Sequence, residues 1–436
     1  MRWEWTTPPW TPTDTDRSRS AHEEREKRVT TGIAAAEAAL RYNIRPLSVR
    51  APLRLRGALL EMGVDADLAG ACGEAIAIEG LVPDQASGLD RVARAGGVRM
   101  GAAPDGRRAV LAGPPASLAG VATRLAGEGP PLDDLGGALT AALAGHGSRP
   151  PLPCGDRWLR FGGRTLIMGI LNVTPDSFSG DGLAGDVAAA VALAERLVAE
   201  GADLIDIGGE STRPGSAPVD AATELRRVMP VLEALVGRLP VPISVDTRKA
   251  EVASAAIAAG AGMVNDIWGL RGDPEMAPVV AASPRVSVVA MHNRHDHGEG
   301  PLLAEVGRGL RESLLIAARH GIAADRVVVD PGFGFGKTPA QNLELVQRLG
   351  ELGGIGCPLL LGASRKSTIG LVLEGAPPEL RLEGTLALCV LAVAAGAEIV
   401  RVHDVVPIRR GLMTADAVLR EIPAAVRSAP APGRTG

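Results

Sequence analysis

The stretch that decides the fold is TLIMGILNVTPDSFSGDGLAGDVAAAVALAERLVAEGADLIDIG, residues 165–208. It opens with branched apolar residues, passes through a Gly-rich turn and a helix-like segment at 186–201, and ends in a second apolar run. A strand of a parallel sheet is buried on both faces and is therefore almost continuously apolar. The segment predicts two parallel strands joined by a helix.

The same pattern continues toward the C-terminus. Further apolar runs occupy 241–247, 261–267, 286–292, 326–332, 358–364 and 398–404, and helix-like segments include 248–260 and 341–353. Eight such runs alternating with helices over roughly 250 residues predict an α/β fold with a (β/α)8 TIM barrel, which we place at 155–425. An open doubly wound sheet is the competing architecture. Polar residues at nearly every strand end favour the barrel, because barrels gather their sites there.

The chain before the barrel divides into two parts. Residues 1–30 are rich in Thr, Pro and charge without any core-forming period, so we expect a disordered tail. Residues 31–147 contain short periodic pieces, such as a strand-like run at 107–113 and a helix-like run at 117–129, and predict a small α/β domain of unknown function. The Gly- and Pro-rich segment at 145–156 reads as the linker to the barrel.

Composition excludes several classes of protein. The net charge of −4 over 436 residues gives no basic surplus for nucleic acid. The four cysteines lie far apart without a CxxC pair, which disfavours a disulfide framework or a zinc site. No segment has about 18 successive apolar residues, and the N-terminus lacks the order of a signal peptide. We therefore expect a cytoplasmic protein that does not bind membranes.

The polar residues at the strand ends fall into two chemical groups. Asp and Asn side chains at the strand ends, together with Lys366, combine acceptors and donors that suit a flat heterocycle with amino, ring N–H and carbonyl groups. The second group suits an oxyanion, and barrels often bind phosphate after strands seven and eight. Its members are Asn172, Thr212, Arg401 and His403. The two groups together imply a substrate with a flat polar head and a phosphorylated tail.

Eight motifs resemble those of the dihydropteroate synthases and occur in that family's order. They are MGILNVTPDSFS (168–179), DIGGESTRPG (206–215), SVDT (244–247), NDI (265–267), MH (291–292), DPGFGFGK (330–337), GASRKS (362–367) and RVHD (401–404). The first, second and sixth are long enough to be specific, and the set spans the whole barrel.

This resemblance implies a transferase of folate biosynthesis that condenses 6-hydroxymethyl-7,8-dihydropterin diphosphate with p-aminobenzoate. It implies that Asn172 helps to hold Mg2+ and that Thr212, Arg401 and His403 contact the diphosphate. Asp246, Asn265, Asp330 and Lys366 resemble the pterin-binding set, and Arg213, Pro214, Ser364 and Phe335 resemble the p-aminobenzoate site. The implied catalytic residues are Asn172, Lys366, Arg401 and His403. A homodimer is also implied.

One departure and two alternatives accompany this resemblance. Many family members carry an acidic residue directly after the second Ser of the first motif, whereas this chain has Gly180 there and Asp181 one position later. A pterin-dependent methyltransferase shares such a barrel, and a catalytically silent pterin-binding paralogue would keep the ligands. The front domain does not resemble a pterin pyrophosphokinase, because Tyr42 is the only aromatic residue between 31 and 150.

Overall fold

The computed structural model describes most of the chain. The described residues are 30, 32–34, 36–38, 40–47, 52–65, 68, 74–144, 149–174, 186–211, 217–294, 301–420, 422 and 427. The predicted tail at 1–30 lies outside this set except for Thr30, which is helical. No helix in the described ranges is both long and apolar enough to cross a bilayer.

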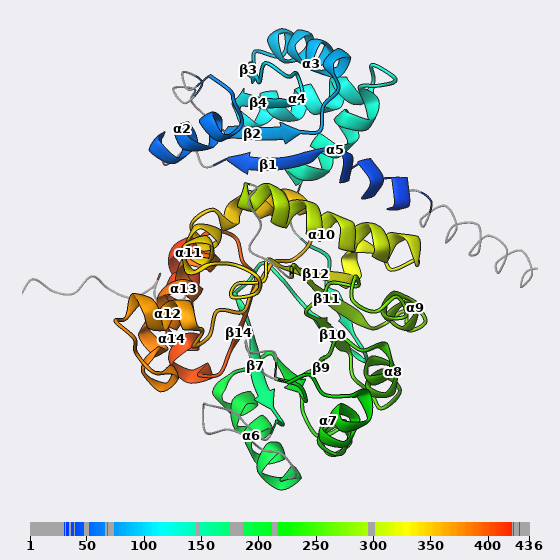
Figure 1. Cartoon of the computed structure of the whole chain (residues 1–436), viewed down its shortest axis with the longest axis vertical. Coiled ribbons are helices and arrows are strands. Elements are labelled where there is room, and N and C mark those ends of the chain that lie inside the picture. The colour runs from blue at the N-terminus through cyan, green and yellow to red at the C-terminus, as the bar shows by residue number, and fades with distance from the viewer. Residues whose placement is uncertain are drawn as a thin grey trace, which may run out of the picture.

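Eight parallel strands form the ring of a barrel, seen almost end-on in Figure 1. Their order is β12-β11-β10-β9-β8-β7-β14-β13, and a parallel bridge between Val329 and Leu359 joins the two ends. The strands are β7 (Leu166–Asn172), β8 (Leu204–Gly208), β9 (Ile243–Asp246), β10 (Met263–Asp266), β11 (Ser287–Met291), β12 (Val327–Asp330), β13 (Leu360–Leu361) and β14 (Ile399–Val402). The TIM-barrel prediction is confirmed, and the open doubly wound sheet is wrong.

Helices surround this ring and follow the strands in order. They are α6 (Val187–Glu200), α7 (Ala221–Leu235), α8 (Ala250–Ala258), α9 (Met276–Ala281), α10 (Leu302–Arg319), α11 (Pro339–Gln347), α12 (Ser367–Val372), α13 (Leu382–Ala394) and α14 (Val405–Leu419), with short 3-10 helices η2 (Ala324–Arg326), η3 (Leu349–Ile355) and η4 (Pro378–Leu380). The helix expected at 341–353 is thus divided between α11 and η3. Local signals fix several ends: Asp186 caps α6 by accepting from the Ala189 amide at 2.8 Å, and Gly201 ends it in the left-handed region.

A short hairpin closes the amino-terminal end of the barrel. Strands β5 (Leu152–Cys154) and β6 (Arg157–Leu159) form it, and β5 lies in the segment at 145–156 that reads as a linker in the sequence. Leu152, Cys154 and Leu159 are buried together with inward residues of the barrel strands. The hairpin was not predicted, because strands of three residues give no detectable period.

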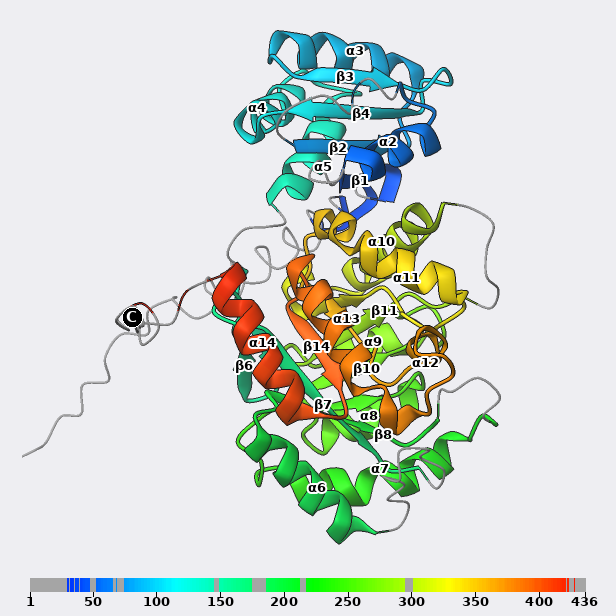
Figure 2. The ribbon, with the colours of Figure 1, turned by 90° about the vertical axis from the view of Figure 1, so that its left-hand side faces the viewer.

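The front domain is a four-stranded antiparallel sheet with helices packed on it (Figure 2). The strand order is β1-β2-β4-β3, and the core includes Tyr42 and Leu111, both fully buried. Its elements are β1 (Asn43–Leu47), α2 (Pro52–Glu61), β2 (Glu74–Glu79), α3 (Pro83–Ala95), β3 (Arg99–Ala102), β4 (Arg108–Gly113), α4 (Pro115–Ala126) and α5 (Asp133–Ala144). The strand and the helix expected at 107–113 and 117–129 are present.

Buried polar groups join the front domain to the outside of the helix ring, beside α10. Arg45 pairs with Glu351 at 2.5 Å and with Glu79 at 2.7 Å, and the Arg45 side chain is only 2% exposed. Arg311 of α10 donates to the Asn43 side chain at 2.5 Å and to the Ile44 carbonyl at 2.7 Å. Removal of one partner from such a buried pair is costly, so these contacts join the front domain to the barrel.

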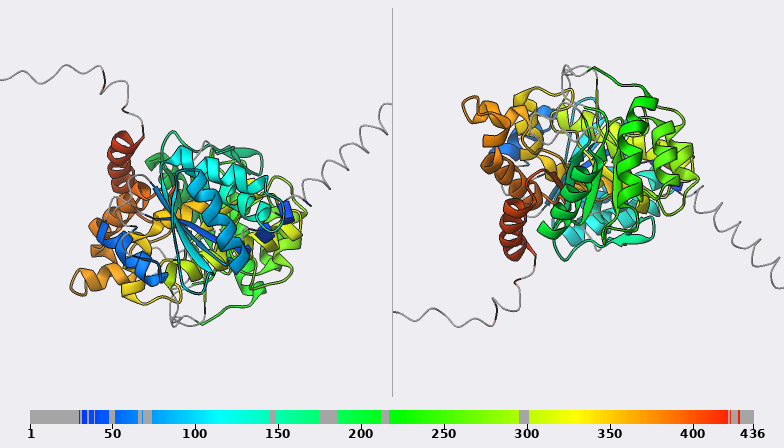
Figure 3. Two further views of the ribbon diagram at one scale, coloured as in Figure 1. Left: turned by 90° about the horizontal axis from the view of Figure 1, so that it is seen from above. Right: turned by 90° about the horizontal axis from the view of Figure 1, so that it is seen from below.

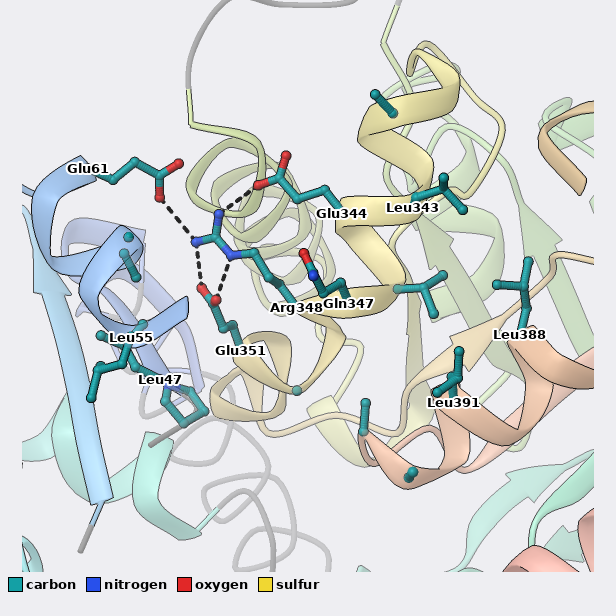
Figure 4. A pocket seen from close by; sticks show the side chains of 18 residues that line it. Leu47, Leu55, Glu61, Leu343, Glu344, Gln347, Arg348, Glu351, Leu388 and Leu391 are labelled. Carbon is teal, nitrogen blue, oxygen red and sulfur yellow. Dashed lines mark hydrogen bonds and ion pairs between the residues drawn. The ribbon is translucent and has the colours of Figure 1, made fainter. Parts of the chain in front are cut away.

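A groove of about 1270 Å³ lies at this junction, between α2 and the helices α11 and α13 (Figure 4). Arg348 lies on one side and pairs with Glu61, Glu344 and Glu351, while Leu343, Leu388 and Leu391 form the apolar side. None of the residues that line the groove follows the carboxyl end of a barrel strand. The groove is therefore separate from the site that the sequence predicts.

Candidate functional site

Side chains from five strands converge at the carboxyl-terminal mouth of the barrel. Arg401 of β14 donates from Nε to Asp206 Oδ2 at 2.7 Å and from Nη2 to Asp246 Oδ2 at 2.8 Å. Asn265 of β10 donates to the same Asp206 oxygen at 2.9 Å. A side chain at Gly362, after β13, would lie 3.7 Å from Arg401 and 3.8 Å from Asp330 Oδ2. Because Gly362 has no side chain, the space beside Arg401 and Asp330 stays open.

Asp206 belongs to this cluster although the sequence reasoning did not include it among the site residues. It is fully buried, and within the described part of the chain its Oδ1 has no hydrogen-bond partner. A buried carboxylate oxygen without a donor is costly and points to a ligand that supplies one. The signal in the sequence was an acidic residue in the middle of the apolar run at 202–209.

Burial changes the acidity of the groups in the cluster. Burial raises the pKa of Asp246 from 3.8 to about 7, although the Arg401 charge opposes this shift. Burial also raises the pKa of Asp330, against the charge of Lys366 and the Gly332 amide that donates to Asp330 Oδ1 at 2.7 Å. Clustered carboxyls with raised pKa values are typical of a functional site.

Lys366 reaches the cluster from the amino terminus of α12. Its Nζ donates to the Phe333 carbonyl and lies 4.3 Å from the centre of the Phe335 ring. Burial lowers the pKa of Lys366 to about 8, whereas the charge of Asp330 raises it. An ammonium over an aromatic face is attracted by the ring's electrons. The loop after β12 therefore contacts Lys366 twice, through the Phe333 carbonyl and through the Phe335 ring.

Ser364 and His403 form a second group beside the cluster. Ser364 Oγ lies 3.0 Å from His403 Nδ1 and accepts from the His403 amide at 3.3 Å. Arg365, which follows Ser364 in the chain, has a positive φ of 58° and makes a bidentate pair with Asp404 at 2.9 and 2.6 Å. This pair fixes the loop after β13 against the end of β14.

Asn172 ends β7 and is the predicted metal ligand. A side chain at Gly208 would lie 3.4 Å from Asn172 Oδ1 and 3.8 Å from Asp246 Oδ2, so both oxygens border the same space. No group of three or more His, Cys, Asp and Glu side chains among the described residues is arranged to hold a metal. Mg2+ bound mainly through substrate phosphates and water needs only one or two protein oxygens, and Asn172 fits that role.

Four expected residues lie outside the described residues: Thr212, Arg213, Pro214 and Asp181. The segment that leads to the first three is anchored by an ion cluster. Lys249 pairs with Glu210 at 2.5 Å and also with Glu224, which is fully buried, while Arg248 pairs with Glu210 at 3.1 Å. The roles of Thr212, Arg213 and Pro214 in substrate binding, and that of Asp181, stay predictions.

The family profile described as pterin binding enzyme matches residues 168–403. The dihydropteroate synthase of Bacillus subtilis (strain 168) is 48% identical over 258 residues, which are 59% of this chain and 90% of the relative. That of Escherichia coli (strain K12) is 46% identical over 246 residues, 55% of this chain and 86% of the relative. The front domain accounts for most of the chain outside these matches.

Solved structures of dihydropteroate synthases are similar to this chain as well. A Xanthomonas albilineans dihydropteroate synthase with 4-aminobenzoic acid is 46% identical, with a TM-score of 0.59 over 65% of this chain and 100% of the other. The same enzyme in complex with 7,8-dihydropteroate is 43% identical, with a TM-score of 0.56 over 64% of this chain and 100% of the other.

Proposed function

The chain belongs to the dihydropteroate synthases of the pterin-binding enzyme family, which are transferases, and we propose how its site performs that activity. The barrel condenses 6-hydroxymethyl-7,8-dihydropterin diphosphate with p-aminobenzoate to give 7,8-dihydropteroate and diphosphate. The observation that carries the proposal is the meeting of Asp206, Asp246 and Asn265 around Arg401 in the barrel mouth. Binding of p-aminobenzoate and dihydropteroate by a similar enzyme supports it.

The pterin ring lies deepest in the mouth. Its amino and ring N–H groups donate to the carboxylates of Asp206, Asp246 and Asp330, and its carbonyl accepts from Lys366 and from the Asn265 amide. The unpartnered Asp206 Oδ1 supports this placement, because a ring N–H would satisfy it. The ring also takes the place of the Arg401 guanidinium on Asp246 Oδ2, where the two would compete for one oxygen.

The diphosphate points outward, toward the ends of β7 and β14. Arg401, His403 and Thr212 contact it, and Asn172 holds the Mg2+ that neutralises its charge and makes it a better leaving group. Arg401 borders both parts of the site, since it donates to Asp206 and Asp246 of the pterin site. Once displaced by the ring, it is free to pair with phosphate oxygens.

The reaction needs little acid–base chemistry. The C–O bond between the exocyclic methylene and the diphosphate breaks, and the dihydropterin ring carries the resulting positive charge. The neutral amine of p-aminobenzoate, held by Arg213, Pro214, Ser364 and Phe335, then attacks that carbon and loses a proton. The chain's residues act by binding the leaving group, aligning the amine and excluding water.

A homodimer is the proposed assembly. Large apolar side chains are exposed on α13 and α14, including Leu391 at 56%, Met413 at 59% and Val418 at 79%. Leu371 and Val372 of α12 are exposed as well, and the three helices lie on one side of the molecule (Figure 3). An apolar face of this kind on a folded domain supports association with a second copy.

The decisive experiment measures diphosphate release by the purified full chain with Mg2+ and the dihydropterin diphosphate, with and without p-aminobenzoate. Release that depends on p-aminobenzoate and yields dihydropteroate is expected. Pterin binding without turnover would instead indicate the silent paralogue. Methyl transfer from a methylated folate would indicate the methyltransferase.

A further inference from the structure

The loop between β12 and α11 is folded around the amine of Lys337. Gly332, Gly334 and Gly336 all have positive φ, at 71°, 83° and 56°, so the loop curls and its carbonyls turn inward. Lys337 Nζ donates to the carbonyls of Gly332 and Phe335, both at 3.0 Å. Two carbonyls of the loop, those of Gly332 and Phe335, are thus bound by one side chain.

The same amine also ties the loop to the neighbouring strand. Lys337 Nζ lies 3.4 Å from the His292 carbonyl and 3.2 Å from His292 Nδ1, directly after β11. A side chain at Gly332 would lie only 2.0 Å from that carbonyl, so the backbones of the two loops touch. Burial lowers the pKa of His292 to about 2, which keeps its ring neutral and able to accept.

Placing an amine here is costly. Lys337 is 6% exposed, and burial lowers its pKa from 10.5 to about 7. Within the described part of the chain the hydrogen bonds of its amine reach no carboxylate, so three carbonyl dipoles and one imidazole satisfy it. An apolar side chain would fill the space at lower cost but would leave the carbonyls unpaired.

The loop backbone that Lys337 binds also contacts or carries three site residues, namely Lys366, Phe335 and Asp330. The Phe333 carbonyl accepts from Lys366, the Phe335 ring lies 4.3 Å from the Lys366 amine, and the Gly332 amide donates to Asp330. Lys337 itself does not face the substrate space, because its amine points into the loop. Any effect it has on the reaction must pass through this backbone.

We propose that Lys337 is a positioning residue that sets the Phe333 carbonyl and the Phe335 ring against Lys366 and so controls the binding of the arylamine. The proposal rests on the proposed function, in which Phe335 borders p-aminobenzoate and Lys366 binds the pterin. Because Phe335 borders the arylamine and not the C–O bond that breaks, a shift of its ring weakens p-aminobenzoate binding more than it slows bond cleavage. Lys337 therefore affects the KM for p-aminobenzoate more than kcat.

The test compares Lys337→Met, which removes all donors, with Lys337→Gln, which keeps two, in the full chain. We expect Lys337→Met to raise the KM for p-aminobenzoate by about 10- to 100-fold, with a smaller change in kcat, and Lys337→Gln to recover part of the loss. The control is Leu345→Ala, which removes a fully buried side chain from α11 and lowers Tm without raising KM.

A second comparison keeps the proposal testable if Lys337→Met does not fold. Lys337→Gln combined with Phe335→Ala is no worse in KM than Phe335→Ala alone, because both act through one ring. Additive losses, or a lower Tm with an unchanged KM, would overturn the positioning role. If the wild-type chain shows no release of diphosphate that depends on p-aminobenzoate, the proposed function fails instead.

Discussion

Arg45 of the front domain and Glu351 of the barrel form an ion pair of 2.5 Å that is almost closed to solvent, with side chains 2% and 8% exposed. The two residues are 306 positions apart in the chain. Arg45 also holds Glu79, so one guanidinium links the front sheet to η3. A buried ionic contact thereby joins the front domain to the barrel.

Removal of this pair is expected to destabilise the whole chain. Arg45→Met leaves Glu79 without a guanidinium partner and Glu351 with Arg348 alone, so we expect the free energy of unfolding to fall by about 1.5–3 kcal/mol in denaturant titrations. Arg41→Met is the matched control, because its pair with Asp134 is about half exposed and is worth about 1 kcal/mol or less. Equal losses for the two variants would show that the junction does not stabilise the fold.

Lys366→Ala is expected to weaken binding of the dihydropterin diphosphate by about 10- to 100-fold, because a charged hydrogen bond contributes about 1.5–3 kcal/mol. Isothermal titration with a non-reacting pterin diphosphate analogue measures this loss, while Tm reports on the fold. The control is Arg238→Ala, whose pair with Glu195 of α6 is about half exposed and lies among the outer helices. An unchanged affinity in Lys366→Ala would remove it from the pterin site.

Arg401→Ala is expected to act mainly through the diphosphate. The guanidinium is paired with Asp206 and Asp246, and we propose that the pterin ring takes its place on these carboxylates. Free pterin should therefore keep most of its affinity, while the diphosphate substrate loses about 10- to 100-fold. A comparable loss for free pterin in the same titrations would contradict this division of roles.

The raised pKa of Asp246 predicts a specific dependence of stability on pH. Its pKa is about 7 in the folded protein, above the ordinary 3.8, so the folded state binds the proton more tightly. The stability that this proton contributes is present below about pH 4 and is lost as the pH rises through 7. We expect Asp246→Asn to gain stability relative to wild type between pH 5 and 8. A relative loss over that range would mean that Arg401 lowers this pKa instead.

The dimer prediction is tested on the exposed face of α14. Met413→Glu introduces charge at a side chain that is 59% exposed and is expected to convert the dimer to a monomer in light scattering, with the barrel still folded. Leu60→Glu is the control, since Leu60 of α2 is 63% exposed but lies in the front domain. Wild-type protein that is monomeric at micromolar concentration would sink the proposal.

The barrel could be predicted from the sequence alone, and so could the polar residues that end its strands. Parallel strands buried on both faces leave long apolar runs, and their polar ends carried Asp246, Asn265, Asp330, Lys366 and Arg401 in a recognisable order. The periodic pieces before residue 147 were likewise enough to indicate a separate small domain.

Tertiary structure alone decided three other features. The β5–β6 hairpin is too short to leave a period, the pairing of Arg45 with Glu351 joins distant segments, and the Lys337 amine reads in sequence as the end of a glycine-rich loop. Each depends on burial and on donor–acceptor geometry between segments that meet only after folding. A local sequence pattern indicates which side of a segment faces the core. It does not indicate which distant residue pairs with a buried charge.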